Sequence, residues 1–182
     1  AIDDEIRKRI WAITSTAEAN FKSMGVDIRG TEPSPGNLDG GLTTLEEKSL
    51  GSIRKGGTSP IVQVVKYAER PSGKGLVIMD GPAHDIVSDT GMIAAGAQVI
   101  AFTTGRGTPV GSPIAPVIKI SSNSIVYHSM RDNIDINAGA ILDGDESIQS
   151  VGEQILKDII DVASGKLTRA EILGHHEFAI HA

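Results

Sequence analysis

Short, mostly apolar runs alternate with helical patterns after Gly73, and this alternation constrains the fold more than any other feature. Three runs predict buried strands: residues 76–79 (LVIM), 99–102 (VIAF) and 117–120 (VIKI). Residues 134–136 form a weaker fourth candidate. Strands separated by helices favour a parallel sheet with right-handed crossovers. We therefore expect an open α/β fold in three layers, with a mostly parallel sheet of roughly four or five strands and helices on both faces.

The helical segments follow from apolar spacing and from capping signals. A long first helix, ended by Gly25, shows one apolar face: Ile2, Ile6, Ile10, Ile13, Ala17, Phe21 and Met24. A second helix is expected to start near Thr43 or Thr44 and to end at Gly56-Gly57, and shorter helices cover residues 88–95 and a segment through His128. The last long helix spans residues 148–162 and is capped by Gly165. The pattern leaves residues 60–65 unassigned.

Composition agrees with this class and narrows it. The 182 residues suit a single domain covering 1–182, and 40% hydrophobic with only 3% aromatic residues indicates a core of Ile, Val, Leu and Ala. The fold is thus expected to be Rossmann-like but not dinucleotide-binding. A G-x-G-x-x-G fingerprint would require glycine at Val110, and the loop leads to Pro113 and another strand rather than to a helix.

The charge pattern excludes several kinds of partner. The net charge is −6 with no basic stripe, which argues against nucleic acid and anionic membranes. The longest apolar stretch, residues 91–102, is too short to span a bilayer and contains Gln98. The chain has no cysteine and shows no signal peptide, so we expect a cytoplasmic location.

The loop of residues 103–111 is the main candidate site, because ligands of parallel sheets bind beyond the carboxyl ends of the strands. Gly105 and Gly107 allow backbone N–H groups to approach an anion, Thr104 and Thr108 add hydroxyls, and Arg106 offers a planar fork that matches a carboxylate. The alternative is a tight surface loop in which Arg106 is merely solvated or pairs with a nearby aspartate.

A second loop, residues 34–44, leads into a predicted helix N-terminus, where free N–H groups favour an anion. Asn37, Thr43 and Thr44 are the candidate substrate-binding side chains there. An ordinary capped helix explains the same residues equally well.

Metal-binding signals are weak. Asp80 directly follows the first predicted strand and is the only metal candidate that we name, although an aspartate in such a turn more often caps the next helix. Asp85 and Asp89 follow it, and the histidines His175, His176 and His181 match no zinc spacing. No Ser-His-Asp arrangement is recognisable, and the catalytic residues stay unassigned.

Long segments of the chain, in order and without large gaps, resemble the altronate and galactarate dehydratase family, which consists of sugar-acid hydro-lyases. These segments are PSPGNLDGGLTTLEEKSLGSIRKGGTSPIVQVV, GLVIMDGPAHDIVSDTG, AAGAQVIAFTTGRGTPVGSPIAPVIKISSN, DNIDINAG and VASGKLTRAE. The resemblance implies metal-dependent removal of water from a hexonic or hexaric acid, giving a 2-keto-3-deoxy acid. Ser52 and Ala138 stand where some members of the family have cysteine.

The resemblance further implies that this chain is the C-terminal part of a longer enzyme. A divalent metal, Fe²⁺ or else Mn²⁺ or Mg²⁺, would then bind mainly outside this chain. The expected partners are an anionic sugar acid, the N-terminal region of the same enzyme and further copies in a homo-oligomer. Two alternatives stay open: a sulfolactate sulfo-lyase subunit of the same wider family, and a non-catalytic anion-binding or oligomerisation domain.

Overall fold

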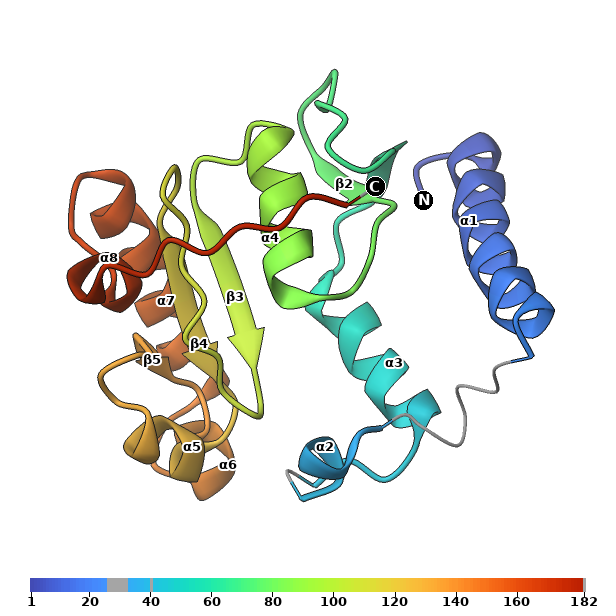
Figure 1. The fold of residues 1–182 in the computed structure, drawn as a ribbon. Helices are drawn as coiled ribbons and strands as arrows, with labels where there is room; N and C mark the ends of the chain where they lie inside the picture. The colour runs from blue at the N-terminus through green and yellow to red at the C-terminus, as the bar shows by residue number, and fades with distance from the viewer. Residues whose placement is uncertain (26–32, 40, 182) are drawn as a thin grey trace. The chain divides into compact units, whose positions relative to one another are not determined.

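The computed structural model describes residues 1–25, 33–39 and 41–181, and the chain divides into two compact units, residues 1–81 and 82–182. Each unit contains its own parallel sheet (Figure 1). The open α/β class expected from the sequence is therefore confirmed. The strands are distributed over two small sheets, of two and three strands, where the sequence predicted one larger sheet. The expectation of a single domain stays a prediction.

The described part of the N-terminal unit pairs two strands and contains three helices. Strand β1 (Ile61–Val65) runs parallel to β2 (Leu76–Met79), with Val64 opposite Ile78. Residues 60–65, which the sequence left unassigned, thus contain a strand. The helices are α1 (Asp4–Ser23), α2 (Pro35–Asp39) and α3 (Leu45–Lys55).

Helix α1 follows the predicted periodicity, but its apolar face is mostly uncovered. Only Ile6 on this helix is buried, whereas Phe21 and the adjacent Met24 are exposed. Trp11 is 75% exposed. Periodicity correctly identified the helix, and the expectation that it shows one apolar face holds, but that face does not form a core within the described residues.

The C-terminal unit is built on three parallel strands in sequence order, β3 (Ile100–Thr104), β4 (Val117–Ser121) and β5 (Ile136–Asn137). All five residues of the central strand β4 are buried. The connecting helices are α4 (Asp85–Ala94), α5 (Ser124–Ser129), α6 (Ala140–Asp143), α7 (Ile148–Ala163) and α8 (Arg169–Leu173).

Helices pack on both faces of this sheet, as the three-layer prediction requires. On one face Ile118 and Ile120 of β4 join a cluster with Val162, Ile155 and Ile159 of α7. On the other face Val117 and Ile100 pack with residues of α4, namely Ile86, Met92 and Ile93. Alternation along β4 therefore places Lys119, which has the same parity as Val117, on the face that α4 covers.

The ends of the last helices match the capping signals in the sequence. Ser147 caps α7 by accepting a hydrogen bond from Ser150 N–H, and Gly165 follows the helix at φ +105°, a conformation that glycine adopts without a Cβ penalty. Thr168 and Glu171 form a capping box at the start of α8. Residues 175–181 then continue as an extended tail, and Ala179 N–H donates to Thr90 Oγ1 of α4 (Figure 1).

Candidate anion-binding site

The carboxyl edge of the three-stranded sheet is lined by polar side chains. β3 ends at Thr104, β4 at Ser121 and β5 at Asn137, and the parallel pairing places Thr104 opposite Ser121 and Ser121 opposite Asn137. This is the edge at which open parallel sheets bind ligands. The loop of residues 103–111 leaves from it directly, as the sequence predicted.

Thr104 and Gly107 shape the exposed turn of this loop. Gly107 N–H donates to Thr104 Oγ1 at 2.9 Å, which closes a turn around Gly105 and Arg106. Gly107 has φ +88°, and a Cβ on it would lie 2.4 Å from Met130 Sδ, so only glycine fits here. The turn therefore packs against α5 and against Met130, which directly follows that helix.

Gly105 and Arg106 are exposed at the tip of the turn. A Cβ built on Gly105 would lie 3.4 Å from the hydroxyl of Ser122, which is also exposed. Among the described residues no carboxylate pairs with Arg106 within 4.0 Å, so the alternative in which an aspartate holds Arg106 is not seen there. A free guanidinium beside a hydroxyl and backbone N–H groups can bind a carboxylate.

Thr108 contributes differently from the other predicted residues. It is buried, and its Oγ1 accepts a hydrogen bond from Val110 N–H at 3.4 Å. Its hydroxyl therefore helps to fold the loop. Of the five residues predicted in this loop, Gly105 and Arg106 are exposed, Thr104 and Gly107 are partly buried, and Thr108 is buried.

A hydroxyl and amide cluster next to this loop was not singled out from the sequence. Ser121 Oγ donates to Asn123 O, and Asn123 caps α5 by accepting from Ile125 N–H. Ser124 Oγ exchanges hydrogen bonds with Asn137 at 3.0–3.1 Å. The signal was present in the run SSNS directly after the third predicted strand and in the DINAG segment, which overlaps the end of the fourth.

The second predicted loop lies in the N-terminal unit, and the backbone N–H and hydroxyl of Thr43 already donate within it. Thr44 caps α3 by accepting from Glu47 N–H at 3.1 Å. Glu47 Oε2 in turn accepts from Thr43 N–H at 2.8 Å and from the Thr43 hydroxyl. These hydrogen bonds, the side-chain one first, lower the pKa of Glu47. An internal carboxylate thus takes the place that an external anion would occupy at this helix terminus.

Asn37 lies in α2, where its backbone N–H donates to Ser34 O and its carbonyl accepts from Leu42 N–H. Its side chain, with Thr43 and Thr44, stays a predicted substrate contact. Asp80 is exposed immediately after β2. Within the described ranges no group of three or more His, Asp and Glu side chains could hold a metal ion, so the residues present do not complete a metal shell.

Sequence reasoning also missed a buried charged cluster around Lys119. Lys119 is 0% exposed, and its Nζ donates to Val110 O at 3.0 Å. Asp89 of α4 is 2% exposed, and neither of its carboxylate oxygens has a hydrogen-bond partner in the part of the chain that the structure describes. Burial, and then the charge of Asp85, raises the pKa of Asp89 to about 7, although Lys119 opposes this shift. Burial lowers the pKa of Lys119 against the charges of Asp135, Glu177 and Asp89.

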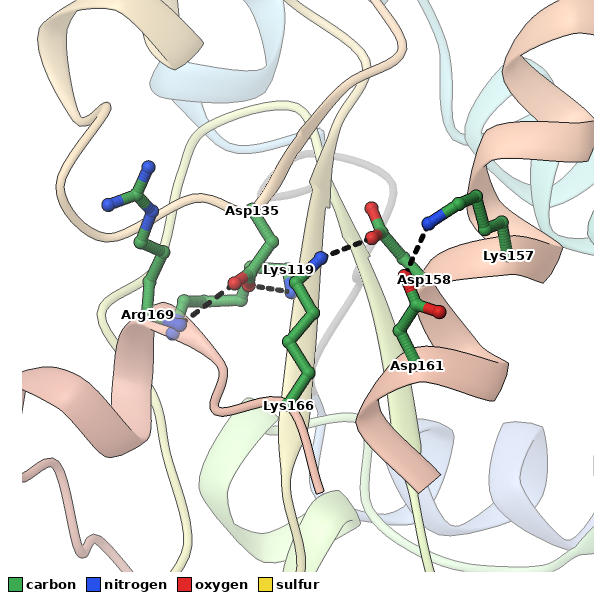
Figure 2. A network of polar contacts seen from close by, with 7 residues as sticks. All are labelled: Lys119, Asp135, Lys157, Asp158, Asp161, Lys166 and Arg169. Carbon is green, nitrogen blue, oxygen red and sulfur yellow. Dashed lines mark hydrogen bonds and ion pairs between the residues drawn. The ribbon is translucent and has the colours of Figure 1, made fainter. Parts of the chain in front are cut away.

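Asp135 connects this cluster to α8 (Figure 2). Its Oδ2 accepts from Lys119 N–H and its Oδ1 from Arg169 N–H, both at 2.8 Å. Asp135 N–H also donates to Lys119 O, so the hydrogen bonding between β4 and β5 begins one residue before the start of β5. Further along, exposed pairs join Lys157 to Asp161 and Lys166 to Asp158. Such surface pairs contribute little to stability.

These features define an open parallel α/β domain with a polar, arginine-bearing loop at the ends of its strands. The entire chain, residues 1–182, matches the family described as D-galactarate/altronate dehydratase, C-terminal. The chain belongs to this family, as its resemblance at the sequence level indicated. None of the described helices is long and apolar enough to cross a membrane.

Similar proteins include lyases with two kinds of leaving group. The chain is 43% identical over 166 residues to galactarate dehydratase (L-threo-forming) of Escherichia coli, covering 91% of this chain and 32% of that protein. It is 41% identical to altronate dehydratase of Bacillus subtilis, over 81% of this chain and 30% of that protein. It is 36% identical to the (2R)-sulfolactate sulfo-lyase subunit beta of Chromohalobacter salexigens, over 98% of this chain and 46% of that protein. The chain thus spans less than half the length of each of these relatives.

Proposed function

We propose that this chain is the C-terminal domain of a sugar-acid hydro-lyase and that it holds a carboxylate of the substrate. The reaction would remove water from a hexonic or hexaric acid, such as altronate or galactarate, and give a 2-keto-3-deoxy acid. The exposed guanidinium of Arg106 at the carboxyl end of β3, without a carboxylate partner among the described residues, carries this proposal.

The chemistry explains why such a group is needed. Dehydration takes a proton from the carbon next to the carboxylate, expels the neighbouring hydroxyl and places charge on the developing enolate. Arg106 would hold the carboxylate through two parallel hydrogen bonds, and the Ser122 hydroxyl and the N–H groups of the turn would fix its orientation. The Thr104 hydroxyl accepts from Gly107 and still has its own proton to donate.

The base and a divalent metal, Fe²⁺ or else Mn²⁺ or Mg²⁺, belong in this proposal to residues beyond this chain. Asp89 and Lys119, the two buried ionisable side chains of the C-terminal unit whose pKa values are shifted, are 2% and 0% exposed and so do not reach a substrate at the loop. The expected homo-oligomer and the cytoplasmic location are likewise part of the proposal. The similarity to much longer relatives supports the participation of further regions.

Replacement of Arg106 by lysine in the complete enzyme tests the proposal. The change keeps the charge but loses the fork, and a charge-assisted hydrogen bond contributes about 1.5–3 kcal/mol. We expect kcat/KM for galactarate or altronate to fall at least about tenfold, with an unchanged melting temperature. The matched control is Arg131→Lys at another exposed arginine. Normal kinetics together with a lower melting temperature in Arg106→Lys would show that Arg106 only supports the loop.

A second candidate is elimination of sulfite from sulfolactate, supported by the similarity to the sulfo-lyase subunit across 98% of this chain. Both reactions remove a group from the carbon next to the one that loses the proton, so the same carboxylate contact serves either. Turnover of sulfolactate but not of altronate or galactarate would favour this candidate. Binding of these acids without any turnover by the complete protein would indicate a non-catalytic anion-binding domain.

A further inference from the structure

We propose that buried Lys119 and the C-terminal tail, residues 175–179, clamp the base of the loop and thereby position the exposed turn for anion binding. This inference rests on the proposed function for its ligand, a sugar-acid carboxylate. It adds positioning residues that lie outside the turn. The base of the loop is attached at three points within the C-terminal unit.

The first attachment comes from inside the sheet. Lys119 Nζ donates to Val110 O at 3.0 Å, and Val110 is itself 3% exposed and packed with Val117 and Ile100. A fully buried ammonium is costly unless its donors are used, because desolvation penalises the charge. Lys119 nevertheless lies on a strand whose other residues are apolar apart from one serine, and it is the residue of this strand whose side chain contacts the base of the loop.

The second attachment comes from the tail. Glu177 Oε2 accepts from Gly111 N–H at 2.9 Å, while its Oε1 lies 3.1 Å from His175 Nδ1. Burial favours the protonated form of Glu177, but the hydrogen bonds from Gly111 and His175 outweigh it and lower its pKa. Glu177 is therefore a carboxylate at neutral pH, and Gly111 donates to a charged acceptor, which is the stronger kind of hydrogen bond.

The third attachment is close packing at Gly111. A Cβ on this residue would lie 2.6 Å from His175 O and 2.9 Å from Ala170 Cβ. The tail therefore lies directly against the loop backbone, and only glycine fits. His175 N–H donates to Ala170 O, and Ala179 N–H donates to Thr90 Oγ1, so the tail is fastened to α8 and to α4 on either side of this contact.

These contacts hold the two residues at the base of the loop: Lys119 of the sheet binds Val110, and the tail binds Gly111. The exposed turn is separated from them only by Thr108, which is buried, and Pro109, whose φ is restricted. With few soft dihedrals between the clamp and Gly107, release of the clamp loosens the turn that presents Arg106. A preformed turn binds an anion more tightly because less conformational entropy is lost on binding.

The test uses two clamp variants, Gly111→Ala and Lys119→Met, in the full-length protein. The matched control is Gly152→Ala, because a Cβ at Gly152 of α7 meets no atom within 4 Å. The first readout is hydrogen exchange without ligand, at the Gly107 amide, which bonds to Thr104 and not to the clamp. The second readout is the affinity for galactarate measured by calorimetry on protein shown to be folded by circular dichroism.

We expect the Gly107 amide to exchange at least about tenfold faster in both clamp variants and the affinity for galactarate to fall at least about tenfold, with neither change in Gly152→Ala. Exchange at the Ala179 amide shows whether Gly111→Ala has displaced the tail. If the tail is displaced and Gly107 exchanges at its original rate, the clamp is refuted. If the exchange results hold but the unaltered protein binds no galactarate, the clamp stands and the proposed function fails. Gly111→Ala keeps the test decisive if Lys119→Met does not fold.

Discussion

Replacement of Asp89 by asparagine should make the protein less sensitive to rising pH. Asp89 is 2% exposed, and its oxygens have no hydrogen-bond partner among the described residues. Burial, followed by the charge of Asp85, raises its pKa from 3.8 to about 7. When folding raises the pKa of a carboxyl group, ionisation of that group costs more free energy in the folded state than in the unfolded state. The folded protein is therefore more stable while the group is protonated than after it ionises. That contribution is complete below the unfolded pKa and is lost as the pH rises through the folded pKa.

The magnitude follows from the size of the shift. A change from 3.8 to about 7 is roughly three pH units, and each unit corresponds to about 1.4 kcal/mol, giving a total on the order of 4 kcal/mol. About 2.5 kcal/mol of this falls between pH 5 and pH 8. Asparagine has nearly the same shape and does not ionise, so Asp89→Asn removes this term. Lys119 has a lowered pKa and titrates in the opposite sense, with stability gained as the pH rises.

The assay is urea denaturation of both proteins at half-unit steps from pH 5 to pH 8. The free energy of unfolding of Asp89→Asn minus that of the unaltered protein should rise by about 2.5 kcal/mol over this range, and any fixed effect of the substitution cancels in the comparison. Asp145→Asn, at an exposed carboxylate, is the control and should show no such trend. Parallel curves for Asp89→Asn and the unaltered protein would refute the assignment of Asp89 as a carboxyl group that is protonated in the folded state.

Two further predictions concern packing and activity. Gly139→Ala should lower the free energy of unfolding by about 1–3 kcal/mol, because its Cβ would lie 2.4 Å from the backbone nitrogen of Ser124, which no side-chain rotation relieves; denaturation against Gly152→Ala measures this, and an unchanged midpoint contradicts it. The 182-residue chain alone, supplied with Fe²⁺ or Mg²⁺, should fold but form no 2-keto-3-deoxy acid from galactarate or altronate, as measured by product assay. Turnover by this chain alone would show that the base and the metal ligands lie within it.

The strands of the C-terminal unit could be predicted because their local sequence is decisive. Parallel strands covered on both faces read as short apolar runs, and β3 and β4 do so. The division into two sheets could not be predicted in the same way. Pairing is a property of distant segments, and the sequence neither identified β1 as a strand nor indicated that it pairs with β2 rather than with the other strands.

The residues of the exposed turn in the candidate site could be singled out from the sequence, whereas the contacts that hold the base of the loop could not. Glycines, threonines and an arginine after a predicted strand mark a candidate binding loop by residue type alone, and the structure places that loop at the carboxyl end of β3. Lys119 carries no such mark, since one lysine within an apolar run usually lies on the solvent side of an edge strand. Its surroundings include the carbonyl of Val110 nine residues before it, and Asp89 of α4 and Glu177 of the tail, which are more distant in the sequence. The same applies to Thr108, whose hydroxyl turns inward.

The two cations associated with this loop differ in how their charge is balanced, and this difference assigns their roles. The charges of Asp135, Glu177 and Asp89 each act on Lys119. Two of these side chains also accept backbone hydrogen bonds: Asp135 accepts from two N–H groups, and Glu177 accepts from Gly111 N–H. Below its raised pKa of about 7, Asp89 is mostly protonated and neutral, and the positive charge of Lys119 is then balanced by the carboxylates of Asp135 and Glu177. Arg106 has no such partner among the described residues. Because Lys119 is compensated internally and Arg106 is not compensated by any described residue, Arg106 is the cation of this loop to which we assign the proposed contact with a substrate carboxylate.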